Sequence, residues 1–153
     1  MKKKDALFYI VLIILIATLV FIFQNSLQPA AESSEKSESV MNSVKPLFEF
    51  FLGRGYVTDH IIRKTAHFIE FTVLGAELML LAVLSINKLR FQNFLNCLFA
   101  GLTSAVIDES LQLLTDRGPL VQDILLDFCG VMTGVLIVLL TKPLFIKKRN
   151  RYY

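Results

Sequence analysis

The sequence has few charged residues, and some of these lie within long apolar runs. Only 19% of its 153 residues are Asp, Glu, Lys or Arg, whereas 54% are hydrophobic and the mean hydropathy is +0.58. A typical soluble domain has about 25% charged residues. A lipid bilayer is therefore the expected solvent for this chain.

Cysteine is also scarce. Cys97 and Cys129 are the only two, and they are predicted near opposite ends of adjacent membrane spans. A disulfide requires Cα atoms within about 7 Å of each other, so this placement argues against one. We expect two reduced, apolar side chains.

Three functional signatures are absent from the sequence. It contains no nucleotide-binding glycine pattern and no internal repeat, and neither Ser104 nor Ser110 has the partners of a nucleophilic triad. Helix packing is the expected use of these two serines. The lack of a repeat argues against a carrier, because many secondary transporters are built from repeats.

Four apolar stretches are each near the roughly 20 residues that a helix needs to cross the hydrocarbon core. They predict an all-α integral membrane protein with transmembrane helices at residues 6–23, 60–86, 94–114 and 122–141. The backbone must be helical there, because lipid cannot hydrogen-bond to exposed peptide groups. The first stretch is interpreted as a retained helix, since no clear signal-peptidase site follows it.

The connection at residues 24–59 begins as a polar, Ser/Glu-rich segment. Apolar residues then recur at helical spacing, at Val40, Val44, Leu47, Phe48 and Phe51. This pattern predicts an amphipathic helix at residues 34–52 that lies in the outer interface. A loop that packs on the bundle is the alternative. The connections at residues 87–93 and 115–121 are short.

Positive charge is concentrated in the segments 1–5, 87–93 and 142–153, which four crossings place on one side of the membrane. These segments hold ten of the sixteen cations: Lys2, Lys3, Lys4, Lys88, Arg90, Lys142, Lys147, Lys148, Arg149 and Arg151. The positive-inside rule makes that side cytoplasmic, so both termini are expected inside. The basic tail is expected to contact anionic lipid rather than nucleic acid.

Each of the last three spans carries polar residues on one helical face. Steps of three, four or seven positions keep the residues of each set on one face of a helix. The sets are Arg63, His67, Glu70 and Glu77 in the second span; Ser104, Asp108 and Gln112, with Glu109 beside them, in the third; and Asp123 and Asp127, continued by Gly130 and Gly134, in the fourth.

These polar faces also agree in depth. At 1.5 Å per residue, His67, Asp108 and Asp127 all fall about 10 Å from the outer surface. Each unpaired charge in a span costs about 3 kcal/mol or more, so the set is expected to face inward and surround a polar cavity open to the outside.

Several of these residues also have a purely structural interpretation. Lys64 and Asp123 lie near helix ends, where a charged side chain can reach the interface without any further role. Gly130 and Gly134 form a GxxxG pair, typical of close helix packing. Glu77 is deeper and nearer the inner surface, where Lys88 or Arg90 could pair with it.

Three ordered motifs carry a family resemblance. RKTAHFIEF (63–71), IDESLQ (107–112) and TDRGPLVQDILLDFCG (115–130) resemble, in order and spacing, elements of the VanZ-like family, and the resemblance covers residues 8–141. It implies a four-helix protein of a Gram-positive type bacterial cell membrane. It also implies a family whose founding members are associated with resistance to teicoplanin-like glycopeptide antibiotics. Phe71 stands where the family often has Tyr.

An enzyme acting on a lipid-linked cell-envelope precursor is the first functional hypothesis. Candidate catalytic residues are His67, Glu70, Asp108, Glu109 and Asp127, because imidazole and carboxylate groups serve in acid–base chemistry. Candidate substrate-binding residues are Arg63, Lys64, Gln112, Arg117 and Asp123, with arginine suited to phosphate or carboxylate. The carboxylates could also hold a divalent cation such as Mg²⁺, although no ligand spacing is diagnostic.

Two other functions use the same residues differently. In the second hypothesis, the outer cavity captures a lipid head group or the lipid tail of an antibiotic without any chemistry. In the third, the protein is a proton-coupled carrier in which Glu77, deep in its span, acts as the relay.

Overall fold

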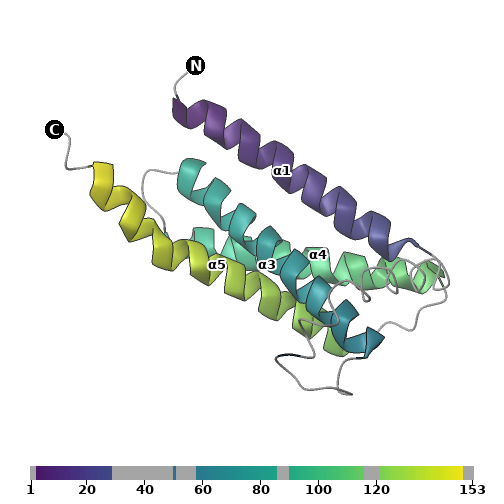
Figure 1. Cartoon of the computed structure of the whole chain (residues 1–153). Coiled ribbons are helices and arrows are strands. Elements are labelled where there is room, and N and C mark those ends of the chain that lie inside the picture. The colour runs from purple at the N-terminus through teal and green to yellow at the C-terminus, as the bar shows by residue number, and fades with distance from the viewer. Residues whose placement is uncertain (1–2, 29–49, 51–57, 86–89, 116–120, 150–153) are drawn as a thin grey trace.

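The computed structural model describes residues 3–28, 50, 58–85, 90–115 and 121–149 (Figure 1). Its helices are α1 Lys3–Ser26, α3 Asp59–Ser85, α4 Phe91–Gln112 and α5 Val121–Arg149, with a 3₁₀ turn, η1, at Leu113–Thr115. No strand occurs in these ranges. The prediction of an all-α protein is confirmed.

Four helices are long and apolar enough to cross a membrane, which confirms the predicted multi-pass architecture. They contain the candidate spans Asp5–Ser26, His60–Ser85, Phe91–Thr115 and Val121–Thr141. Large apolar side chains such as Ile13, Phe99 and Leu140 are exposed on the outside of the bundle, as lipid requires. The predicted interfacial helix falls almost entirely outside the described residues and stays a prediction.

Successive helices run in opposite directions, so every helix has one end at each of the two ends of the bundle. In Figure 1, the start of α1 and the end of α5 lie at one end. The end of α1, the start of α3, the end of α4 and the start of α5 lie at the other end. The polar residues of the spans gather near this second end, which we call the site end.

The most extensive helix contact in the bundle is between α3 and α5. Three glycines bring these two backbones together. A Cβ at Gly134 would overlap the carbonyl oxygen of Thr72, one at Gly130 would overlap that of Phe68, and one at Gly75 would overlap the backbone of Val131. The packing role predicted for the GxxxG pair therefore agrees with the geometry.

Fully buried apolar side chains fill the space around this contact. Phe71 and Leu74 of α3 and Val131 and Val135 of α5 are 0% exposed. Ile22 of α1 packs into the same core. Phe71 is thus a core residue, and its ring occupies an apolar position in which a phenolic hydroxyl would need a partner.

The glycine contact yields a test of the fold. Gly134→Ala is expected to destabilise the protein by about 1 to 3 kcal/mol, because the added methyl meets backbone atoms that cannot rotate away. The measurement is the thermal unfolding midpoint in detergent, followed by circular dichroism. Ala17→Leu, which enlarges an exposed side chain of α1, is the control and should leave the midpoint unchanged. Equal midpoints for Gly134→Ala and the wild type would contradict the close contact.

Candidate functional site

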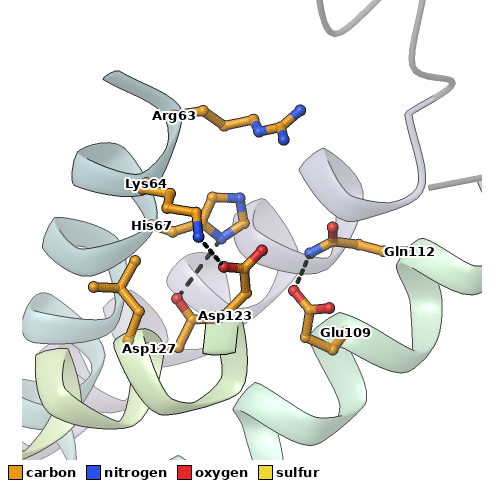
Figure 2. Close-up of a pocket in the computed structure, with 8 residues that line it drawn as sticks. Arg63, Lys64, His67, Glu109, Gln112, Asp123 and Asp127 are labelled. Atoms are coloured by element: carbon orange, nitrogen blue, oxygen red, sulfur yellow. Dashed lines mark hydrogen bonds and ion pairs between the residues drawn. The ribbon is translucent and has the colours of Figure 1, made fainter. Parts of the chain in front are cut away.

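A small polar pocket lies at the site end, where α3, α4 and α5 meet (Figure 2). Its cavity measures about 20 Å³. A cavity of that size holds about one water molecule or one ion. Its lining residues are Arg63, Lys64, His67, Glu109, Gln112, Asp123, Leu126 and Asp127.

Basic side chains occupy the outer edge of the pocket, which we call the mouth. Figure 2 shows Arg63 extending above the other lining residues, and its side chain is exposed. Lys64 Nζ lies 2.6 Å from Asp123 Oδ1, with side chains 28% and 23% exposed. Helix α3 therefore supplies two cations at the mouth, one of them tied to α5.

A buried cluster of three residues lies at the inner side of the pocket, and we call it the floor: His67 and Asp127, which line the pocket, and Asp108, which lies next to His67 but is not a lining residue. His67 Nδ1 lies 3.8 Å from Asp108 Oδ2 and 3.9 Å from Asp127 Oδ1. These separations are longer than hydrogen bonds. Asp108 and Asp127 are 0% and 1% exposed, so two carboxylates from different helices face one imidazole in a site that is closed to lipid.

Helix α4 adds a hydrogen-bonded pair beside the floor. Gln112 Nε2 donates to Glu109 Oε1 at 3.0 Å and to Asp108 Oδ2 at 3.2 Å. Glu109 is 3% exposed. Because these residues are three and four positions apart on one helix, the amide holds both carboxylates in place.

Helix α1 contributes a wall that the sequence interpretation missed. Ser26, which is 1% exposed, donates from its hydroxyl to Asp108 Oδ1. The neighbouring Asn25 side chain hydrogen-bonds to Glu70. Thr115 in η1 donates to the Ser26 carbonyl at 3.3 Å, which ties α1 to the end of α4. The only signal for this wall in the sequence was a pair of polar residues, Asn25 and Ser26, just after the first apolar run.

Two further candidate residues, Glu70 and Glu77, do not line the pocket. Glu70 is partly buried and faces α1 through Asn25. Glu77 accepts a hydrogen bond from Thr18 at 3.0 Å, a different partner from the lysine or arginine considered from sequence. Arg117 falls outside the described residues, so its proposed role is untested.

The site can act chemically in three ways. The mouth presents a guanidinium and an ammonium group, which bind phosphate or carboxylate. The floor presents an imidazole beside carboxylates, a combination that can exchange protons or bind a metal ion. The buried carboxylates of Asp108, Glu109 and Asp127 make the inner side of the site acidic, whereas the cations Arg63 and Lys64 lie at its edge.

Comparison with known proteins yields one family. The VanZ/LLP1 family model matches residues 8–142, nearly the whole chain. No curated protein and no solved structure matches the chain. The match includes all of α3 and α4, most of α1 and α5, and every site residue described above, and the family is linked to teicoplanin resistance. The chain belongs to the VanZ/LLP1 family of multi-pass membrane proteins.

Proposed function

We propose that the chain binds the anionic head group of a membrane-embedded lipid, such as a lipid-linked cell-envelope precursor, at a site that faces the outer leaflet. The observation that carries this proposal is the pair of cations at the mouth of the pocket, Arg63 and Lys64. They lie at the end of a bundle whose sides are apolar. A lipid in the surrounding membrane can therefore reach them with its head group while its chains stay in hydrocarbon.

The size of the cavity limits how a head group can bind. A space of about 20 Å³ admits an ion or a water molecule but no sugar or phosphate ester. The head group must contact the mouth and leave the floor closed. Arg63 suits this contact, because a guanidinium group offers two parallel donors to a phosphate.

The distribution of charge supports the proposed orientation. Lys3 begins α1, Arg90 directly precedes α4, and Lys142 lies in the last half of α5, all on the side of the bundle opposite the site end. By the positive-inside rule, those ends face the cytoplasm of a bacterial cell, with both termini inside. The site then faces outward, where cell-envelope precursors are consumed and where glycopeptide antibiotics act.

Catalysis is the second candidate function, and one observation favours it. His67 Nδ1 lies within 4 Å of two buried carboxylates, Asp108 and Asp127, and an imidazole beside carboxylates is a combination that serves in general acid–base catalysis. Chemistry on the bound head group would then follow binding at the mouth.

Removal of the arginine at the mouth tests the binding proposal. The probe is a short-chain polyprenyl phosphate, added to the purified protein in detergent and followed by isothermal titration calorimetry. Arg63→Gln is expected to weaken binding by about 10-fold or more, because a charge-assisted hydrogen bond is lost. Arg90→Gln removes the same charge at the opposite end of the bundle and should leave the affinity unchanged. Equal losses in both variants, or none in either, would contradict a specific site at the mouth.

The fate of the bound lipid separates binding from catalysis. The binding proposal expects the polyprenyl phosphate to keep its mass after prolonged incubation with the wild-type protein, as measured by mass spectrometry. A new mass produced by the wild type and lost in His67→Gln would instead establish an enzyme. Glu77→Gln serves as the control, since this carboxylate hydrogen-bonds to Thr18 away from the pocket.

Reporter fusions test the orientation. Alkaline phosphatase inserted after Asn42, in the connection between α1 and α3, should be active because the connection is expected outside. A fluorescent protein fused after Tyr153 should be fluorescent because that terminus is expected inside. The opposite pair of results would place the site at the cytoplasmic face and would refute the outward-facing proposal.

A further inference from the structure

We propose that His67, Asp108 and Asp127 form a binding site for one divalent transition-metal ion, Zn²⁺ or Mn²⁺, at the floor of the pocket. Each residue comes from a different helix and offers one ligand atom, and these atoms lie within 4.8 Å of one another. Donor atoms bonded to one divalent ion at about 2.0 to 2.4 Å lie about 3 to 4 Å apart. The separations of 3.8 and 3.9 Å from His67 Nδ1 to the two carboxylates fit this spacing.

Asp127 supplies an independent reason for a cation. Its carboxylate is 1% exposed, and neither oxygen accepts a hydrogen bond from any described residue. A buried carboxylate without such partners is strongly destabilising, because it has lost its water without compensation. It lines the pocket and faces His67 (Figure 2). A divalent ion there would supply the missing interaction.

The carboxylate of Asp108 is held in place by hydrogen bonds, as metal-binding carboxylates usually are. Ser26 donates to Asp108 Oδ1, while Gln112 donates to Oδ2 at 3.2 Å. Hydrogen bonds of this kind fix the direction of a ligand and raise metal affinity. The oxygen on the His67 side keeps lone-pair capacity for an ion, because a carboxylate oxygen can accept more than one interaction.

The ligand set selects the class of ion. Imidazole nitrogen with two carboxylate oxygens suits Zn²⁺ or Mn²⁺ better than Mg²⁺ or Ca²⁺, which prefer oxygen alone. Two carboxylates, a neutral imidazole and a doubly charged ion sum to zero net charge, which lowers the cost of placing the group inside a membrane. The cavity that His67 and Asp127 line measures about 20 Å³, which is the space that one ion needs.

Three protein ligands leave a coordination position free, as in catalytic metal sites. The pocket is continuous with the mouth, so this position would face Arg63 and Lys64. In this arrangement His67 acts as a ligand rather than as a general base. The site goes beyond the proposed lipid binding, because an ion can bind whether or not a lipid is present.

Metal binding by the purified full-length chain tests the proposal without any lipid or activity. The protein in detergent is stripped with a chelator, desalted and dialysed against Zn²⁺ or Mn²⁺, and the bound metal is counted by elemental analysis. We expect one ion per chain for the wild type. Asp127→Asn and His67→Gln should each weaken binding by about 100-fold or more, and Ser26→Ala by about 10-fold.

Two controls make the outcome decisive. Glu77→Gln neutralises another buried carboxylate outside the cluster and should bind one ion with wild-type affinity. Bound Mn²⁺ should show coupling to an imidazole nitrogen in pulsed electron paramagnetic resonance, and His67→Gln should remove it. Gel filtration confirms that each variant is folded, and Ser26→Ala, which keeps all three ligands, replaces any variant that aggregates. Absence of bound metal in the wild type, or wild-type affinity in both ligand variants, would overturn the site.

Discussion

The close approach of α3 and α5 is the constraint on which the rest of the structure depends. Gly130 and Gly134 let the α5 backbone lie against the carbonyl groups of Phe68 and Thr72. Asp127 precedes Gly130 by three residues, so it lies on the same face of α5 and also faces α3. The contact that packs the two helices therefore also sets the distance between Asp127 and His67. A bulkier residue at either glycine would push α5 away from α3, which would disrupt the core and increase the distance between Asp127 and His67.

Lipid explains why the polar residues are gathered rather than scattered. A charge in a membrane span is costly unless it faces inward and has partners. Several polar residues in the described helices meet this condition by pairing with a residue of another helix: Lys64 with Asp123, Ser26 with Asp108, and Thr18 with Glu77. Two of these pairs involve α1. The first helix, which is otherwise the most exposed to lipid, is held to the bundle by polar contacts as well as by Ile22.

Helical periodicity and depth were enough to predict that His67, Asp108 and Asp127 would meet, because both follow from the geometry of a regular helix. The role of Ser26 could not be predicted in the same way. Hydropathy ended the first span at residue 23, whereas α1 continues to Ser26. Which helix neighbours which depends on packing, and a single sequence does not contain the register of α1 against α4. Arg117 and the interfacial helix stay predictions.

The opposite charges of the mouth and the floor connect the two proposals. Arg63 attracts an anion, but the buried carboxylates of Asp108, Asp127 and Glu109 would repel it in a medium of low dielectric constant. An ion bound at the floor would neutralise two of these carboxylates and present a positive centre toward the mouth. A phosphate held by Arg63 at the mouth would then lie above neutralised carboxylates and would no longer be repelled by their full charge. Because such coupling is reciprocal, a head group at the mouth would raise the affinity for the ion by the same factor by which the ion raises the affinity for the head group.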